Sequence, residues 1–529
     1  MNFLNSGKGY DLFAREARKD FYVDKTMLID AVYRHAHRNN PYICITRPRR
    51  FGKSTAANMV AAFFDPDTAR KSRKLFSGLA VGALKGKREH QPLCWVEQGK
   101  RAVIRINMID IMPPEVESYK DFYRMLSRRL LEDISEAYPK VSQEGGNIPE
   151  ILEKTGEKFI FVIDEWDAVF EARFMTPKDN ESYILFLKAL LKDKSYVYFA
   201  YMTGILPIAK YSSGSPLNMF GEFNTFGDGI FYPWFGLTME EIQGVMEKCN
   251  TNRPTIEELT AWYDGYIRSL DGIHVFNPTS VSNALAEGSC RSHWTGTGPM
   301  NEVRDIIRHN VEELREDVIR MAGGESLDIE LNGFSVEKME ISTKDEILSA
   351  MVVYGFLTYH EGTLRIPNHE LMLKFRQALA SKELGLNQTI EESKKLLRAT
   401  LDRNHAEVAR LLEELHNEKI PFFKYSDENS LACVVTVGYL AALGRYRLTR
   451  EDKAGKGYAD FTFTPMKRSE TAIILELKYG HSAADALQCI HERDYLARYK
   501  DFERVLLVGI NYSVATKKHT CLTELVENI

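Results

Sequence analysis

The residues best placed to do chemistry near the start of the sequence lie in a basic loop, RPRRFGKS, at residues 47–54. An apolar, strand-like run precedes the loop at residues 41–46, and a helical pattern follows at residues 55–64. Phosphate binds well to the backbone N–H groups of a helix N-terminus, where a lysine can reach the β and γ phosphates and a hydroxyl can ligate Mg²⁺. Lys53 and Ser54 supply these two groups, so the loop predicts a site for a nucleoside triphosphate.

A second set of candidate residues follows an almost wholly apolar run at residues 158–164. This run ends in Asp164 and is followed directly by Glu165. In P-loop enzymes an acidic residue at the strand tip holds the metal ion, and a neighbouring group activates the attacking water. We expect Asp164 in the first role and Glu165 in the second. Thr203, at the end of the next predicted strand, could contact the γ-phosphate.

The loop departs from the usual GxxxxGK[ST] pattern, because Arg47 stands where the first glycine is expected. The guanidinium groups of Arg47, Arg49 and Arg50 could add positive charge near phosphate, form a solvated basic loop or bind nucleic acid. An ordinary α/β domain with an accidental GKS is a further alternative. The expected nucleotide-binding residues are Arg49, Arg50, Phe51, Gly52, Lys53, Ser54, Thr55, Asp164 and Thr203, with Ser54 and Asp164 also as metal ligands.

Near the other end of the sequence, two strand-like runs carry Asp460 and the triplet Glu476-Leu-Lys478. Side chains alternate along a strand, so Glu476 and Lys478 are expected on one face. Phosphodiester hydrolysis needs carboxylates that hold Mg²⁺ and a lysine that orients or deprotonates the attacking water. Asp460 and Glu476 are therefore candidate metal ligands. A surface hairpin with an ion pair between Glu476 and Lys478 is the alternative.

The flanking helical segments add residues to this second site. Gln488 and Tyr495 are seven residues apart, which predicts that they share one face of a helix. Glu428, at the start of an upstream helix, could add a third carboxylate to the metal site. The expected catalytic residues are Glu165 at the first site and Asp460, Glu476, Lys478 and Gln488 at the second.

The predicted elements divide the sequence into three segments. Strand and helix signals alternate through residues 1–235, which predicts an α/β domain with a parallel sheet. Residues 236–385 are expected to form a helical, winged-helix-like region. Residues 386–529 begin with charged helices and end in strands. The predicted strands lie at residues 41–46, 101–107, 158–164, 196–203, 356–359, 363–366, 459–464, 471–477 and 505–511.

Composition narrows the possible function classes. The chain has 529 residues, of which 44% are hydrophobic and 27% are charged, as expected for several globular domains. The formal charge of -5 argues against a broadly basic surface, so contacts to nucleic acid would come from local patches. Seven widely spaced cysteines without a CxxC pair favour a reducing cytoplasm over a disulfide framework. We expect no signal peptide and no membrane contact, because no apolar run is long enough.

The ordered motifs resemble a bacterial family of AAA-ATPase-like proteins with a C-terminal PD-(D/E)XK nuclease-superfamily domain. One departure is Tyr458, at a position where the family usually has an arginine. The arginine-rich loop is typical of the family. The resemblance rests on YVDKT at residues 22–26, RPRRFGKS at 47–54, DE at 164–165, TG at 203–204, WYDGY at 262–266, FNP at 276–278, RIPN at 365–368, AD at 459–460, ELK at 476–478, Gln488 and Tyr495.

This resemblance implies a P-loop NTPase with Mg²⁺ and ATP at the first site and a restriction-endonuclease-like α/β core in residues 386–529. The predicted function is ATP binding and hydrolysis coupled to a Mg²⁺-dependent nuclease that acts on DNA. We also expect a homo-oligomer, and family analogy alone suggests defence against phage or mobile elements. One alternative is a STAND-like switch that holds ATP in a resting state. Another is a domain that binds nucleic acid without cleavage, although the presence of Asp460, Glu476 and Lys478 argues against it.

Overall fold

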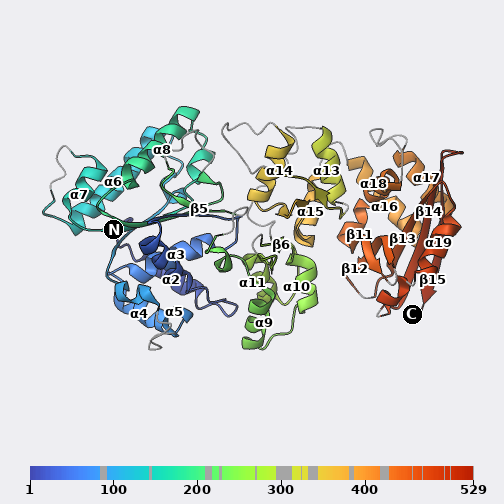
Figure 1. Cartoon of the computed structure of the whole chain (residues 1–529), viewed down its shortest axis with the longest axis horizontal. Helices are drawn as coiled ribbons and strands as arrows, with labels where there is room; N and C mark the ends of the chain where they lie inside the picture. Colours follow the sequence, from blue (N-terminus) through green and yellow to red (C-terminus); the bar gives the residue numbers. More distant parts are fainter. Residues whose placement is uncertain are drawn as a thin grey trace. The chain divides into compact units, whose positions relative to one another are not determined.

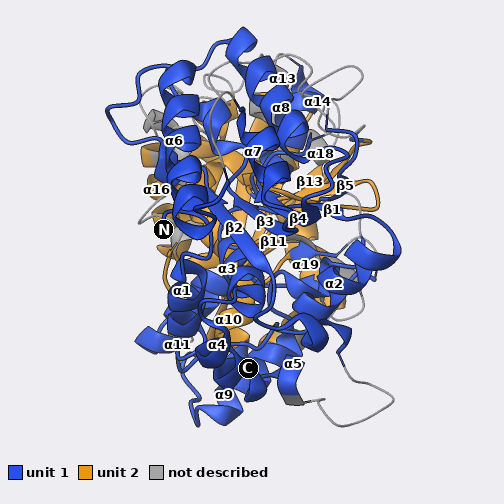
Figure 2. Cartoon of the chain, turned by 90° about the vertical axis from the view of Figure 1, so that its left-hand side faces the viewer, with its two compact units in different colours: residues 1–256, 266–290, 331–355 blue, residues 257–265, 291–330, 356–529 orange. Residues whose placement is uncertain are grey.

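The structure is a computed structural model in which most of the chain can be described. The described residues form two compact units (Figure 2), made of residues 1–256, 266–290 and 331–355 and of residues 257–265, 291–330 and 356–529. The division into segments at residues 235 and 385 stays a prediction. The described ranges are residues 1–83, 92–141, 146–208, 217–224, 229–268, 271–293, 312–322, 324–331, 343–379, 387–416, 428–454, 457–467, 469–493, 495–500 and 502–527.

The first unit is built on a five-stranded sheet in the order β2-β3-β4-β1-β5, in which every neighbouring pair is parallel. Four of these strands confirm the predicted ones, whereas β5 was not predicted because it is short and begins with glycine. The carboxyl ends of parallel strands form the edge where ligands bind in such sheets. The strands are β1 (Tyr42–Thr46), β2 (Ala102–Asn107), β3 (Phe159–Asp164), β4 (Val197–Gly204) and β5 (Gly221–Phe223).

Helices cover both faces of this sheet (Figure 1). Successive strand residues enter opposite cores, so that Phe161 packs with one set of helices and Val162 with the other. Burial on both faces explains why the strands read as continuous apolar runs. One face carries α6 (Tyr119–Ala137), α7 (Ile148–Lys154) and α8 (Pro177–Leu191), and the other carries α1 (Lys8–Glu16), α2 (Leu28–Arg38), α3 (Lys53–Phe64), α4 (Ala69–Ser77) and α5 (Ala80–Ala83).

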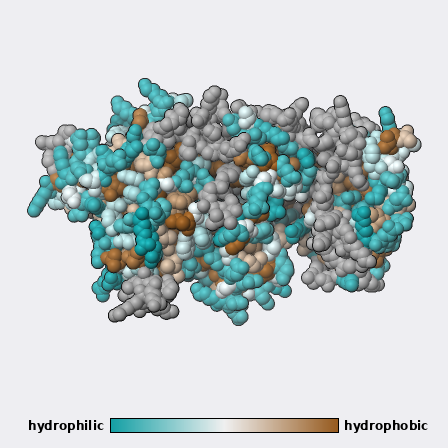
Figure 3. Space-filling model, in the orientation of Figure 1, coloured by the Kyte–Doolittle hydropathy of each residue, from teal (hydrophilic) through white to brown (hydrophobic). Residues whose placement is uncertain are grey.

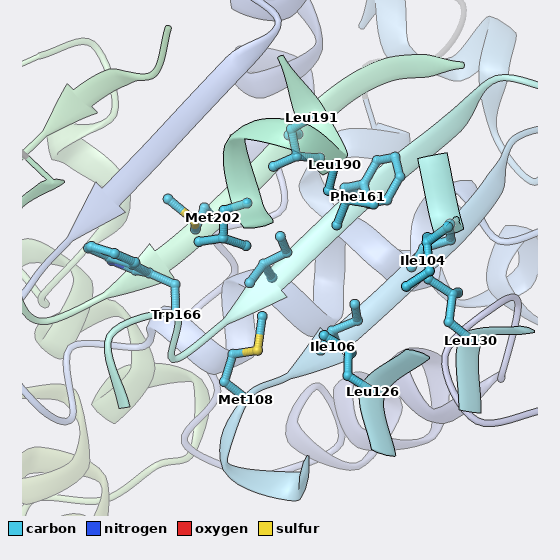
Figure 4. Close-up of a cluster of buried hydrophobic side chains, with 14 of the residues drawn as sticks. Ile104, Ile106, Met108, Leu126, Leu130, Phe161, Trp166, Leu190, Leu191 and Met202 are labelled. Carbon is cyan, nitrogen blue, oxygen red and sulfur yellow. The ribbon is translucent and has the colours of Figure 1, made fainter. Parts of the chain in front are cut away.

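The core beneath α6 shows how tightly the strands are fixed. Ile104 and Ile106 of β2 face Leu126 and Leu130 of α6, and all four side chains are nearly or fully buried (Figure 4). Burying an aliphatic side chain of this size stabilises a fold by about 1.5–3 kcal/mol. The ends of the strands, where the candidate residues lie, are therefore held by a rigid core.

Shorter elements complete the first unit. Thr238 caps α9 by accepting a hydrogen bond from the backbone N–H of Glu241 at 3.4 Å, in a capping box. The remaining elements are η1 (Leu93–Glu97), η2 (Ile109–Ile111), η3 (Ala168–Glu171), η5 (Tyr232–Trp234), α9 (Met239–Lys248), β6 (Tyr266–Ile267), β7 (His274–Val275), α11 (Pro278–Glu287) and α14 (Lys344–Val353).

The first part of the second unit is mostly helical, as predicted for the middle of the chain. Its three-stranded antiparallel sheet, in the order β8-β10-β9, contains the predicted pair of short strands. The two-residue strand β8 was too short to predict. The elements are α10 (Ile256–Tyr263), α13 (Glu312–Ala322), β8 (Leu327–Asp328), β9 (Thr358–His360), β10 (Thr363–Arg365) and α15 (His369–Leu379).

The C-terminal part of the second unit contains a five-stranded mixed sheet in chain order, β11 to β15. The pair β13–β14 is parallel and the other pairs are antiparallel. β11 and β15 were not predicted, since both are rich in polar and charged residues. The elements are α16 (Asn387–Leu401), α17 (His405–Glu414), α18 (Glu428–Gly438), η9 (Leu440–Gly444), β11 (Tyr446–Ala454), β12 (Gly457–Pro465), β13 (Ala472–Tyr479), α19 (Ala483–Glu492), η10 (Tyr495–Tyr499), β14 (Arg504–Ser513) and β15 (Lys518–Glu527).

The coloured surface in Figure 3 is largely hydrophilic, with apolar residues in small separate patches. Within the described ranges, no helix has the length and apolar character needed to cross a bilayer. The six cysteines described by the structure, Cys44, Cys94, Cys249, Cys290, Cys489 and Cys521, all carry free thiols.

Candidate functional sites

The loop between β1 and α3 has a backbone that suits an anionic ligand. Arg50 and Gly52 adopt left-handed conformations, with φ of 71° and 87°. Gly52 is the N-cap residue of α3, and no side chain caps the helix there. The backbone N–H groups of the first helical turn therefore face the loop, where a phosphate would be bound.

Lys53 is the first residue of α3, and its side chain is only 4% exposed. Its Nζ donates a hydrogen bond to the carbonyl oxygen of Pro48 at 2.9 Å. Burial lowers the pKa of this ammonium, and the nearby carboxylates of Glu165, Asp167 and Asp164 act in the opposite direction. Lys53 is thus a buried cation in an acidic surrounding, at the position from which a P-loop lysine reaches phosphate.

Asp164 is fully buried at the carboxyl end of β3. Its Oδ1 accepts a hydrogen bond from Thr203 Oγ1 at 2.6 Å, and its Oδ2 accepts one from Asn107 Nδ2 at 3.2 Å. Thr203 belongs to β4 and Asn107 to β2, so the neighbouring strands hold the carboxylate from both sides. The structure brings Asp164 and Thr203 together, and adds Asn107, which only its place at a strand end could have indicated.

Glu165 adopts a left-handed backbone with φ of 53°, which turns the chain directly after β3. Burial raises the pKa of its carboxyl group, and Lys53 counteracts this shift. Ser54 and Thr55 continue α3 from Lys53, and Phe51 packs edge-on against the ring of Tyr266. The predicted nucleotide-binding residues therefore surround the carboxyl ends of β1, β3 and β4.

Asp167 is a residue of this site that the sequence interpretation missed. Its side chain is 4% exposed, and its Oδ2 accepts hydrogen bonds from the backbone N–H groups of Ile205 and Leu206, at 2.9 and 2.7 Å. Its Oδ1 is buried without a hydrogen-bond partner among the described residues. Asp167 thus ties the turn after β3 to the segment after β4. The spacing Asp-Glu-x-Asp was the signal that could have revealed it.

The Arg47 side chain is buried, so a solvated basic loop is the wrong interpretation for this residue. Its Nη1 donates to the carbonyl oxygens of Thr46 and Phe223 at 2.9 and 3.0 Å. Its guanidinium group also lies over the rings of Tyr232 and Phe235, at 5.3 and 5.6 Å from their centroids. Arg47 therefore anchors the loop to the rest of the first unit.

The next arginine in the loop is partly exposed. The Arg49 side chain is 33% exposed, and its Nη2 lies 3.7 Å from Glu171 Oε2. An ion pair at this distance and exposure contributes little to stability. Because the Arg47 side chain is buried, Arg49 and Arg50 stay the predicted phosphate contacts of the loop.

Glu476 is the centre of the second candidate site. It lies on β13, and its side chain is 3% exposed. Its Oε1 lies 3.3 Å from Lys478 Nζ and accepts a hydrogen bond from Cys489 Sγ at 3.0 Å. Its Oε2 is buried without a hydrogen-bond partner among the described residues. A buried carboxylate oxygen without a partner is costly, so this atom favours a bound cation or an ordered water.

Asp460 lies on the neighbouring strand, β12. Its Oδ2 accepts a hydrogen bond from the backbone N–H of Leu477 at 2.6 Å, directly after Glu476. The described part of the chain holds no group of three or more His, Cys, Asp or Glu residues placed to bind a metal ion. Glu428 begins α18 as predicted, but its side chain lies outside the described residues. The carboxylates of Asp460 and Glu476 are oxygen ligands of the kind that suits Mg²⁺.

The prediction that Gln488 and Tyr495 share one helix face is wrong. The helix α19 ends at Glu492, and Tyr495 begins the separate element η10. The sequence after Glu492 has no glycine or proline that would have indicated this end. Gln488 is exposed and donates from Nε2 to Glu492 Oε1 at 2.7 Å, so the structure does not bring it to Glu476.

Cys489 is the residue of α19 that faces Glu476, and the sequence interpretation passed over it. Burial and the hydrogen bond to Glu476 raise the pKa of its thiol to about 11. The thiol therefore stays protonated at neutral pH and acts as a hydrogen-bond donor to the carboxylate. Only the three-dimensional packing of α19 shows which of two adjacent polar residues points toward the site.

Two family models match the chain. Residues 9–213 match the predicted AAA-ATPase model, and residues 426–520 match a PD-(D/E)XK nuclease superfamily model. No curated protein matches the sequence.

Two solved structures share a remote likeness with the chain. A Walker-type ATPase of Pyrococcus abyssi is 13% identical, with 66% of this chain and 94% of that chain covered and a TM-score of 0.34. The ORC2 protein of Aeropyrum pernix, solved as ADPNP-ADP complexes, is 9% identical, with 69% of this chain and 98% of that chain covered and a TM-score of 0.34.

The two family matches cover the two candidate sites. The first match spans the loop at Lys53 and the strand that ends in Asp164, and the second spans Asp460, Glu476 and Lys478. The two matches support ATPase and nuclease activities. The chain therefore combines an AAA-ATPase-like domain with a C-terminal PD-(D/E)XK nuclease-superfamily domain.

Proposed function

We propose that the protein binds and hydrolyses ATP at its first site and thereby controls a Mg²⁺-dependent nuclease at its second site, with DNA as the substrate. The observation that carries the nuclease proposal is the carboxylate of Glu476, which is almost fully buried and has one oxygen without a described partner. A buried carboxylate of this kind is unfavourable in an ordinary hairpin and favourable at a cation site. Lys478 and Asp460 lie directly beside it.

At the first site, each residue has a role that follows from its position. Lys53 would turn from the Pro48 carbonyl to the β and γ phosphates, because phosphate is a stronger acceptor than a neutral carbonyl. Asp164 and Ser54 would hold Mg²⁺, and Glu165 would accept a proton from the attacking water. Thr203 keeps Asp164 in place through its 2.6 Å hydrogen bond.

At the second site, Asp460 and Glu476 would hold Mg²⁺, which when bound supplies positive charge and lowers the pKa of coordinated water. Lys478 would orient the attacking water beside the scissile phosphate. Hydrolysis joins the water oxygen to phosphorus and breaks one bridging P–O bond. The leaving oxygen gains a proton, and the second proton of the water is released as the new phosphate monoester ionises.

The finer features of this proposal rest on the family resemblance and on composition. DNA as the substrate, a homo-oligomeric assembly and a role in defence against phage or mobile elements are family-level proposals. Six free thiols support a reducing compartment such as the cytoplasm.

The nuclease half is tested by incubating the full chain with linear and circular DNA and with RNA, in Mg²⁺, in Mn²⁺ or in EDTA. We expect metal-dependent cutting of DNA that is lost in Asp460→Ala and in Lys478→Ala. Arg445→Ala is the matched control, because Arg445 is half-exposed, pairs with Glu470 and lies beside Met466, past the end of β12. Equal cutting by the parent and both site variants contradicts the nuclease assignment.

The ATPase half is tested by measuring nucleotide binding and phosphate release. Lys53→Ala should lose ATP binding, and unchanged ATP affinity contradicts the phosphate-binding role of the loop. Continuous turnover supports an ATP-driven nuclease. One tightly held nucleotide without turnover supports the STAND-like switch instead. Cutting measured with ATP, with ADP and without nucleotide then shows whether the two sites are coupled.

A further inference from the structure

The end of α19 places an arginine beside the carboxylate of Glu476. Arg493 is the C-cap residue of α19, and its Nη1 lies 3.9 Å from Glu476 Oε1. The same Nη1 donates a hydrogen bond to the Tyr495 hydroxyl at 2.9 Å. Lys478 contacts the same carboxylate oxygen from β13. Two cationic side chains from different elements therefore meet at Glu476.

Fold stability does not explain the position of Arg493. Its side chain is 48% exposed, and an ion pair at 3.9 Å with such exposure contributes little free energy of folding. Tyr495, which accepts a hydrogen bond from Arg493, is held rigidly, because its side chain is fully buried in a core with Ile474 of β13 and Ile490 of α19. A fixed hydroxyl therefore orients a flexible, half-exposed cation, which is an arrangement suited to binding a ligand from solvent.

The chemistry of the guanidinium group indicates which ligand. Both described contacts of Arg493 use Nη1, at one edge of the planar group. The guanidinium plane offers five donors in a fork that fits two oxygens of one phosphate. A phosphodiester gains negative charge on its non-bridging oxygens as water attacks, and a cation beside those oxygens stabilises that charge. Arg493 and Lys478 lie next to the carboxylate around which this reaction would occur.

We propose that Arg493 binds the non-bridging oxygens of the phosphodiester that is cut, and that Tyr495 is a positioning residue which orients the guanidinium group. This inference rests on the proposed nuclease function. Arg493 forms no covalent bond in the reaction. It donates hydrogen bonds to the phosphate while the water–phosphorus bond forms and the bridging P–O bond breaks, and it keeps its own protons throughout.

The test compares Arg493→Ala, Arg493→Lys and Tyr495→Phe in the full chain, with Arg445→Ala as the control. We expect Arg493→Ala to lower kcat about 10²-fold, as removal of one preorganised donor does at other sites. Arg493→Lys should lose less, because it keeps the charge but not the fork. Tyr495→Phe keeps the packed ring, so a loss in kcat there reports orientation of Arg493 and not a packing defect. Arg445→Ala should cut at the parent rate.

A binding measurement separates phosphate contact from a structural role. Affinity for a labelled DNA duplex is measured in Ca²⁺ over a range of salt concentrations. The slope of log affinity against log salt should become less steep by about 0.9 in Arg493→Ala, as for the loss of one phosphate contact. A change that only disturbed the fold would lower the thermal unfolding midpoint and leave this slope unchanged.

The outcomes also separate this inference from the nuclease proposal. If the parent cuts DNA and Arg493→Ala cuts at the same rate, the role of Arg493 is refuted and the nuclease stands. If the parent cuts no nucleic acid in any metal, the nuclease proposal is refuted. In that case the salt dependence of DNA binding still tests the phosphate contact of Arg493. An unchanged slope in Arg493→Ala refutes this contact, and a reduced slope supports it.

Discussion

Replacement of Glu476 by glutamine should reverse the order of stability between parent and variant when metal is added. The Glu476 carboxyl group is almost fully buried, and its Oε2 has no described partner. A buried polar group left unsatisfied costs about 1–3 kcal/mol, and more if it is charged. Glutamine removes the charge and can still accept a hydrogen bond from Lys478 through its amide oxygen. Its amide nitrogen takes the position of Oε2, so only part of this cost is recovered.

Without metal, we therefore expect Glu476→Gln to raise the free energy of unfolding by about 1 kcal/mol. With metal at about a hundred times Kd, binding should stabilise the parent by about 2.7 kcal/mol and leave the variant unchanged. Without metal, the parent is therefore the less stable protein by about 1 kcal/mol. With metal, it becomes the more stable protein by about 2 kcal/mol, which is the gain from metal binding minus the first value.

The assay is calorimetric unfolding of the full chain in EDTA and in Mg²⁺ or Mn²⁺, without nucleotide. Each kcal/mol corresponds to a shift of about 2–4 °C for a unit of 150–250 residues. Glu503→Gln, an exposed glutamate before β14, is the matched control and should follow the parent in both buffers. The reasoning is refuted if metal stabilises the variant as much as the parent, or if the variant is the less stable protein in EDTA.

Four further predictions concern other residues. Lys53→Ala should weaken ATP binding at least ~10-fold, measured by titration with a fluorescent ATP analogue, because a charge-assisted contact contributes about 1.5–3 kcal/mol. Thr203→Val should lower the rate of ATP hydrolysis more than ATP affinity, since it removes the hydrogen bond that orients Asp164; equal loss in both contradicts this. Asp167→Ala should lower the free energy of unfolding, measured by denaturant unfolding, by about 1–3 kcal/mol, because two backbone N–H groups lose their acceptor. Burial lowers the pKa of His519 to about 4, so the unfolded chain gains a proton first as the pH falls. Stability should therefore fall between pH 6.5 and pH 4 by up to about 3 kcal/mol on account of His519. His519→Phe should remove this part of the pH dependence and leave the part due to His416, whose pKa burial also lowers to about 4.

The sequence predicted the positions of Asp164 and Thr203 at neighbouring strand ends because these residues lie at the ends of strands that are buried on both faces. The sequence of such a strand is a short apolar run, so its end, and the polar residue at that end, can be located from the sequence. Asp164 and Thr203 were found in this way. Asp167 was missed because its role depends on backbone N–H groups at Ile205 and Leu206, which come near only in the folded sheet.

The second site was harder to predict from sequence because its residues come from a mixed sheet and a helix. Glu476 and Lys478 could be paired by strand alternation alone, and their contact at 3.3 Å agrees with that pattern. The helix α19 was extended too far, so Tyr495 was placed on the wrong element. Cys489 and Arg493 were missed because only the packing of α19 and η10 turns them toward Glu476.

The most direct test of the account is cleavage of DNA by the full chain in Mg²⁺, with ATP hydrolysis followed in the same reactions. We predict that the parent cuts DNA, that Glu476→Gln hydrolyses ATP without cutting, and that Lys53→Ala neither hydrolyses ATP nor changes its cutting when ATP is added. Cutting by Glu476→Gln at the parent rate would contradict the central claim.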